Sequence, residues 1–255
     1  MASSPTNNKR AVDHDAPASP TKHAATDAVK KTKVSPETTR FELHYFNVRA
    51  KAELVRLILA FTGVSWENKM TSSWENWLAE KKETTPFGQL PMLVEFENGV
   101  EVFKLAQSHA MARYLGHKYA LIPSHPHHAA LMDSVFESVT DLENFFSRMN
   151  YEKDEKIKAT LKETLYTDKL VAFAKYNEKI LVKNGNNGYF VGKEATIADI
   201  YAFSVLERLE YDNDPRLAEI LKTAPALAKS IETIRKHPKL SAFMAGDRCP
   251  VIFQA

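Results

Sequence analysis

The sequence predicts an α/β domain followed by an all-helical domain, and three observations support this fold class. Strand-like alternation and helical periodicity succeed one another over residues 41–119, in the order β-α-β-α-β-β-α. From residue 127 onward only helical periodicity is present. The first forty residues contain no Leu, Ile, Phe, Tyr or Trp, so they bury too little apolar surface to fold. We therefore expect a disordered tail over 1–40, an α/β domain over 41–119, a linker over 120–126 and a helical domain over 127–255.

The first strand and the helix after it carry clear short-range patterns. Phe41, Leu43 and Tyr45 alternate with polar residues, which is typical of a half-buried strand. Residues 50–62 place apolar side chains at helical spacing and stop at Gly63, a residue that favours the left-handed end of a helix. We expect a strand with one buried face that leads directly into a helix.

Five further elements complete the α/β domain. Asn98-Gly99 supplies the positive φ angles of a tight hairpin turn, so residues 90–103 are predicted to form two antiparallel strands. The other elements are a strand at 66–70, a short helix near 74–82 and a helix over 107–119.

The second half shows helical periodicity throughout and no internal repeat. Thr196 and Asp199 have the spacing of a capping box, in which each side chain bonds to the other residue's backbone at a helix start. We predict helices over 127–149, 157–183, 196–210, 216–221 and 226–236.

The composition argues against several classes of protein. There are 34 Lys+Arg against 32 Asp+Glu, which lacks the basic excess typical of a nucleic-acid binder. No apolar run approaches the roughly 18 to 20 residues that a membrane span needs, and no secretory leader is visible. The single cysteine, Cys249, excludes an internal disulfide and a thiolate zinc cluster. We expect a cytoplasmic protein with neither nucleic-acid nor membrane partners.

A metal site is not predicted. His125, His127 and His128 lie close together, but they fall in a linker beside Pro126 and match no ligand spacing of a known zinc site. Cys249 is far in sequence from the first strand and is expected to have no catalytic role.

Three motifs, in this order and spacing, resemble those of cytosolic glutathione transferases. They are YFNVRAKAELVR from Tyr45, PFGQLPML from Pro86 and QSHAMARYL from Gln107. The strings are most similar to the sigma class, which includes glutathione-dependent prostaglandin isomerases. The resemblance covers residues 41 to about 245. It implies a thioredoxin-like α/β domain, a homodimer, and an enzyme that conjugates the co-substrate glutathione to hydrophobic electrophiles.

The chain departs from the family pattern in two places. Ala50 stands where the family usually has Gly, and the segment between Trp74 and Pro86 is about one residue longer than usual. The second departure leaves open which tryptophan and which lysine match the family's site.

Two residues of the first motif are implied to be catalytic. Tyr45 matches the family's catalytic tyrosine, whose neutral phenol donates a hydrogen bond to the glutathione thiolate. The thiol pKa of a free cysteine is near 8.5, so few molecules are nucleophilic at neutral pH without such a donor. Arg49 would add a positive field near the sulfur. Strand alternation alone favours the alternative that Tyr45 is a core aromatic on the buried strand face, and it is the full set of motifs that favours catalysis.

The second and third motifs are implied to bind the tripeptide. Gln89, Leu90 and Pro91 resemble a segment in which a cis proline exposes the Leu90 backbone to the cysteinyl part of glutathione. Gln107 and Ser108 stand at a helix start, where N–H groups and the helix dipole suit the γ-glutamyl carboxylate. Simple strand punctuation and an ordinary helix cap at Ser108 remain the alternatives.

The glycyl carboxylate would be held by a tryptophan and a lysine ahead of Pro86. Counting back favours Trp77 over Trp74 and Lys82 over Lys81. Both tryptophans could instead be core anchors.

An acidic stripe and an apolar wall complete the expected site. Asp141 follows Asp133 and Glu137 at helical spacing, and the resemblance implies that it reaches the glutathione ammonium of the neighbouring subunit. A solvated helix face is the alternative. Phe46, with Arg49 and the helix end near Arg148 and Met149, would line the pocket of the second substrate. A prostaglandin-type isomerase, or a non-catalytic ligand-binding or structural protein of the same fold, are the competing functions.

Overall fold

The computed structural model describes residues 39–71, 75, 77–78, 82–246 and 248–249. The predicted tail over 1–40 lies almost entirely outside these residues, and so does most of the short helix predicted near 74–82. A 3-10 turn, η3 (Lys82–Thr84), is described at the end of that segment.

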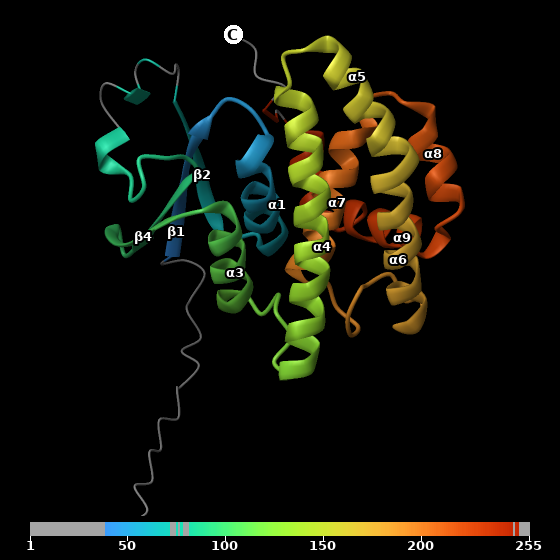
Figure 1. Cartoon of the computed structure of the whole chain (residues 1–255). Coiled ribbons are helices and arrows are strands. Elements are labelled where there is room, and N and C mark those ends of the chain that lie inside the picture. Colours follow the sequence, from blue (N-terminus) through green and yellow to red (C-terminus); the bar gives the residue numbers. More distant parts are fainter. Residues whose placement is uncertain (1–38, 72–74, 76, 79–81, 247, 250–255) are drawn as a thin grey trace, which may run out of the picture. The chain divides into compact units, whose positions relative to one another are not determined.

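One four-stranded sheet forms the first half of the described chain (Figure 1). Its strands β1 (Thr39–Phe46), β2 (Ser65–Thr71), β3 (Met92–Glu97) and β4 (Val100–Ala106) are arranged in the order β2-β1-β3-β4. β1 is parallel to β2 and antiparallel to β3. The predicted hairpin is confirmed, because β3 and β4 are joined at Asn98 and Gly99 with φ of 52° and 82°.

The predicted burial of β1 and the helix after it are also confirmed. Phe41, Leu43 and Tyr45 are buried, while the residues between them are half-buried. A 3-10 turn at Ala50–Ala52 leads into α1 (Glu53–Thr62), which ends at Gly63 with a left-handed φ of 72°. α1 packs against α3 (Ser108–Lys118) and also against α7 of the helical half, so it joins the two halves of the fold.

The second half contains helices joined by turns, and no strand among its described residues. The helix α7 is central, because all of its residues except Glu210 are buried and it packs on α4, α9 and α1. The predicted capping box is present, with the Thr196 N–H donating to Asp199 Oδ2 at 2.7 Å. The helices are α4 (Pro126–Tyr151), α5 (Glu155–Thr164), α6 (Leu170–Lys183), α7 (Ile197–Glu210), α8 (Pro215–Lys222), α9 (Pro225–Arg235) and α10 (Pro238–Ala245).

The structure differs from the sequence analysis at two places in this half. The single helix predicted over 157–183 is α5 and α6 joined by a π-helical turn, η4 (Leu165–Lys169). A π turn shifts hydrogen bonding to i→i+5 without a Gly or Pro to signal it, so side-chain periodicity alone does not reveal it. The short helix α10 was not predicted, although Pro238 at its first position is a recognised start signal.

The sheet and its helices form the predicted thioredoxin-like half (residues 39–118), followed by the predicted helical half (residues 126–249). None of the described helices is both long enough and apolar enough to cross a bilayer.

Candidate active site

A cavity of about 300 Å³ lies where the start of β3 meets the start of α3. Five of its lining residues were predicted from the second and third motifs, so the structure brings these two motifs together. The lining residues are Lys51, Gln89, Leu90, Pro91, Gln107, Ser108 and His109.

The backbone at this cavity has two unusual features. The Leu90–Pro91 peptide bond is cis, as the resemblance implies. Gln107 is the N-cap of α3 and has a φ of 73°, a conformation that is uncommon for residues other than glycine and that clusters at functional sites. Its Nε2 donates to Gln89 Oε1 at 3.3 Å, which links the two motifs directly.

Ser108 is not the helix cap, so that alternative is wrong. Gln107 takes the cap position, and its side chain makes no capping hydrogen bond within the described chain. The first N–H groups of a helix have no partners within the helix and carry its positive dipole end. The start of α3 is therefore suited to an anionic group bound in the cavity.

Tyr45 lies at the end of β1, only 7% exposed, and makes an edge-to-face ring contact with Phe46. Burial raises the pKa of its hydroxyl to about 12, the nearby Tyr151 adds to this, and a hydrogen bond from the Lys51 backbone opposes it. The phenol is therefore neutral at physiological pH and able to donate. Tyr45 does not itself line the cavity, but its backbone partner Lys51 does.

Arg49 is not brought to the cavity. Its guanidinium is buried, and it donates to Glu207 Oε1 at 3.1 Å and to the Cys249 carbonyl at 2.9 Å. Glu207 also accepts from Arg248 at 3.0 Å. The predicted positive field of Arg49 is thus largely compensated by Glu207, and its catalytic role stays a prediction.

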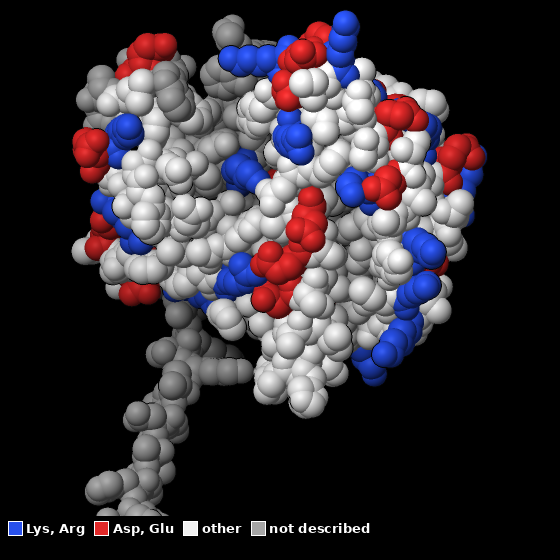
Figure 2. Space-filling view, in the orientation of Figure 1, with Lys and Arg blue, Asp and Glu red and all other residues white. Residues whose placement is uncertain are grey.

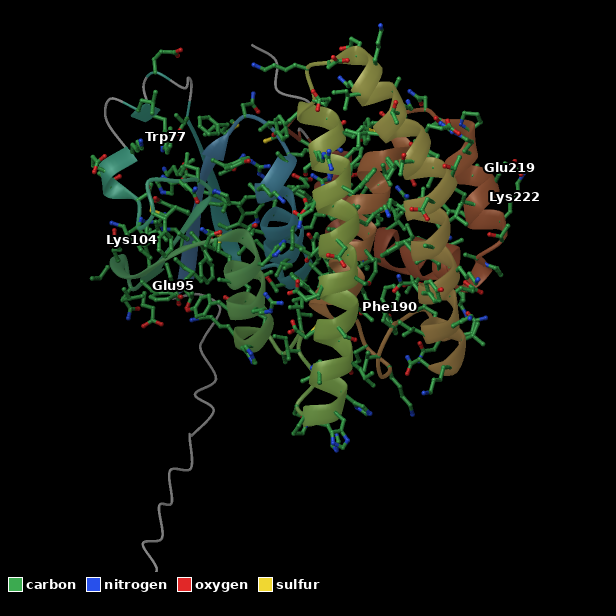
Figure 3. All side chains as sticks on the ribbon, viewed as in Figure 1. Trp77, Glu95, Lys104, Phe190, Glu219 and Lys222 are labelled. Carbon is green, nitrogen blue, oxygen red and sulfur yellow. The ribbon has the colours of Figure 1, made fainter. Side chains whose placement is uncertain are left out.

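Trp77, labelled in Figure 3, belongs to the thioredoxin-like half and does not line the first cavity. It is 4% exposed, contacts the Phe46 ring with centroids 5.9 Å apart, and lines a second cavity of about 240 Å³. Leu90 lines both cavities. Lys82 is exposed in the turn η3. Trp74 and Lys81, the alternatives to Trp77 and Lys82, lie outside the described residues.

Acidic side chains run along the visible face of α4 (Figure 2). Asp133 and Glu137 both pair with Arg113 of α3, whereas Asp141 is exposed and forms no ion pair with any described residue. The stripe is therefore partly a solvated, ion-paired face, and Asp141 is its free member. Near the end of α4, Met149 is 2% exposed and belongs to the core, while Arg148 is exposed.

Sequence reasoning missed Lys51 and His109, both of which line the first cavity. The signals were present: Lys51 lies in the first motif two residues after Arg49, and His109 follows Ser108 directly. It also missed Glu143, which is 4% exposed and lies among the apolar residues of α4. A charged residue on the buried face of a helix normally has a partner, and Glu143 pairs with Lys51.

Family models and known proteins match this chain over most of its length. The N-terminal domain of glutathione S-transferases matches residues 41–117, and the C-terminal domain matches residues 140–247. Glutathione S-transferase P 1 of Xenopus laevis is 31% identical over 210 residues, which cover 81% of this chain and 92% of that protein. S-crystallin 4 of Enteroctopus dofleini is 29% identical over 214 residues, 80% of this chain and 95% of that one.

Solved structures agree with the sequence matches. Prostaglandin synthase D of Nilaparvata lugens superposes with a TM-score of 0.69 at 27% identity, over 83% of this chain and 100% of the other. Fold, motifs and relatives lead to the same conclusion: this chain belongs to the glutathione S-transferase family.

Proposed function

We propose that this chain is a glutathione transferase whose 300 Å³ cavity binds glutathione beside Tyr45. The observation that carries the proposal is the meeting of two motifs in one cavity. The Leu90 backbone can pair with the cysteinyl backbone of the tripeptide, as an added strand would. Gln107 and Ser108, at the start of α3, suit the γ-glutamyl carboxylate.

Tyr45 then acts on the thiol. Its neutral phenol donates a hydrogen bond to the sulfur anion, which lowers the thiol pKa and releases the proton to solvent. A lowering of about two units corresponds to about 2.7 kcal/mol. The thiolate attacks an electrophilic carbon, the C–S bond forms, and either a leaving group departs with its electron pair or an activated double bond takes up a proton.

The second substrate is proposed to be a hydrophobic electrophile. Two aromatic residues near the phenol offer apolar surface. They are Phe46, whose ring contacts Tyr45, and Tyr151, which is 76% exposed. Two other functions have support in the relatives. A prostaglandin-type isomerase is suggested by the likeness to prostaglandin synthase D, and a structural role by the likeness to S-crystallin 4.

Finer features predicted from the sequence belong to the same proposal. We propose a sigma-like, cytoplasmic homodimer in which Asp141 reaches the neighbouring site. Its carboxylate is exposed and pairs with no cation among the described residues, which supports this. Trp77 and Lys82 are proposed to bind the glycyl carboxylate. The domain limits 41–119 and 127–255 are supported by the end of α3 at Lys118 and the start of α4 at Pro126.

The experiment is a substrate panel on the purified wild-type chain. Glutathione affinity is measured by calorimetry, followed by turnover of a small aryl halide, an endoperoxide and an oxidised lipid aldehyde. We expect binding and conjugation of the halide or aldehyde. Isomerisation of the endoperoxide alone would favour the isomerase. Glutathione binding without turnover of any substrate would favour the structural role. Absence of glutathione binding would refute the proposal.

A further inference from the structure

Glu143 is a buried carboxylate for which the proposed mechanism has no use. Its side chain is 5% exposed and accepts from Arg208 Nη2 at 2.7 Å and from the Tyr201 hydroxyl at 2.5 Å. Burial alone would raise its pKa, but His109, Arg208 and Lys51 together hold that pKa well below the usual range. Glu143 is therefore an anion at neutral pH, and two buried donors hold its carboxylate in place.

Lys51, a further partner of Glu143, reaches the cavity. The Lys51 ammonium lies 3.3 Å from Glu143 Oε2, the Lys51 side chain is 40% exposed, and Lys51 lines the cavity while Glu143 does not. An ammonium has three N–H donors, so one is taken by Glu143 and two are left for a ligand. A lysine that is already held loses less side-chain freedom when a ligand binds.

We propose that Glu143 is a positioning residue that holds the Lys51 ammonium at the cavity, where Lys51 binds an anionic group of glutathione. The identity of the ligand rests on the proposed function. The holding of Lys51 rests only on the contacts of Glu143.

The hydrogen bonds of Tyr201, His109 and Arg208 form a network whose final acceptor is the Glu143 carboxylate. Tyr201 has a single hydroxyl hydrogen and gives it to the carboxylate. His109 Nε2, 3.0 Å from the Tyr201 oxygen, must then donate its own N–H to that oxygen. Arg208 donates to Glu143 and also, at 3.5 Å, to the carbonyl of Ala50 in the turn that carries Lys51. The carboxylate therefore anchors α3, α4, α7 and the Ala50–Ala52 turn to one point.

We name Glu143 with Lys51, Arg208, Tyr201 and His109 the Glu143 cluster. The thioredoxin-like half contains a matched control for it. Glu95 is 2% exposed and also accepts from one tyrosine, Tyr114, and one lysine, Lys118. Figure 3 shows Glu95 on the sheet side of the molecule, and neither Glu95 nor Lys118 lines the glutathione cavity.

The test compares Glu143→Gln, Lys51→Ala, the double variant and Glu95→Gln. We expect the KM for glutathione to rise by about tenfold in Glu143→Gln and in Lys51→Ala, a factor equal to about 1.4 kcal/mol. The double variant should be no worse than Lys51→Ala, because Glu143 acts through Lys51. Glu95→Gln should lower the melting temperature but leave the KM unchanged.

A second readout needs neither glutathione nor turnover. The ¹⁵N NMR signal of the Lys51 ammonium, assigned by its absence in Lys51→Ala, should be visible in the wild type and in Glu95→Gln and lost in Glu143→Gln. A signal that persists in Glu143→Gln, or KM effects that multiply in the double variant, would overturn the proposal. A wild type that binds no glutathione would contradict the proposed function, while the NMR result would still decide whether Glu143 holds Lys51.

Discussion

Arg49 and Lys51 are two residues apart in one turn, yet they end in different ionic clusters. Arg49 is buried and joins Glu207, Arg248, Glu53 and Arg56, which we name the Glu207 cluster. Lys51 joins the Glu143 cluster and stays 40% exposed at the cavity. The comparison shows that, of two neighbouring cations, the fold buries one in an ion pair and keeps the other half-exposed at the cavity, where we propose that it binds a ligand.

The two clusters also differ in how much stability the protein loses when one ion-pair partner is removed. In the Glu207 cluster three arginines share two glutamates, and every member has little access to water. Removing one partner of a buried pair leaves an uncompensated charge, which costs about 3–5 kcal/mol. Lys51 can turn to solvent when its partner is removed, and exposed pairs contribute about 0–1 kcal/mol.

The largest expected effect is therefore on stability. Glu207→Gln should lower the free energy of unfolding by about 3–5 kcal/mol, because Arg49 and Arg248 lose their shared carboxylate. Urea unfolding at pH 7 measures it. Lys51→Met is the control and should lose about 1 kcal/mol or less, because Lys51 is half-exposed and Glu143 keeps Arg208 and Tyr201 as donors. Equal losses in the two variants would mean that burial does not separate the clusters.

Tyr45→Phe tests the phenol that accepts a hydrogen bond from the backbone of Lys51, in the turn that carries both cations. We expect kcat/KM for conjugation to fall by on the order of 10 to 10³, since one preorganised donor to a developing anion contributes this much. Glutathione affinity should change far less. Because the phenol pKa of about 12 keeps Tyr45 neutral, the wild-type pH–rate profile should show only the glutathione thiol up to about pH 10. Conjugation at the wild-type rate across pH 6 to 8 would remove Tyr45 from the mechanism.

Asp141 belongs to neither cluster, and its expected partner lies in the neighbouring subunit. Asp141→Asn should weaken glutathione binding by roughly 1.5–3 kcal/mol, the contribution of a charge-assisted hydrogen bond, with little change in folding.

Mixed dimers show from which subunit the Asp141 carboxylate acts. Heterodimers of Asp141→Asn with Tyr45→Phe subunits have one intact site if the carboxylate crosses the interface, and should recover about half the activity. Activity no higher than the mean of the two parent variants would show that the site is not shared.

The smallest expected effect is an acid sensitivity that comes from the Glu143 cluster. A carboxyl whose folded pKa lies below its unfolded value of 4.5 stabilises the fold above that pH, and the contribution is lost as the pH falls through and below it. Between pH 5 and pH 4 the loss is roughly 0.7 kcal/mol. Urea unfolding of the wild type and of Glu143→Gln at both pH values measures it, and the variant should lack this part of the slope. Parallel slopes would contradict the lowered pKa.

Local patterns predicted much of the fold. The buried face with Tyr45, the stop at Gly63 and the Thr196 capping box each depend on residues within a few positions of one another. The motif residues of the cavity were predicted by resemblance, and they meet because β3 and α3 both begin there.

Long-range pairing could not be predicted in the same way. Lys51 meets Glu143 across 92 positions, and Arg49 meets Glu207 across 158. Their charges are visible in the sequence, but periodicity does not say which acid faces which base. The resemblance implied a positive field from Arg49 near the sulfur, whereas in the structure Lys51 of the same motif lines the cavity and Arg49 does not.

Both acids that receive these cations belong to the helical half, since Glu143 lies on α4 and Glu207 on α7. Pairing also runs in the opposite direction, because Arg248 of the helical half donates to Glu53 of α1. Each half therefore supplies charges that the other half neutralises. A chimera that joins this thioredoxin-like half to the helical half of a relative without these acids would bury Arg49 against uncharged side chains. For this chain, the thioredoxin-like half can therefore be exchanged without loss of stability only for a half that suits the same charge partners.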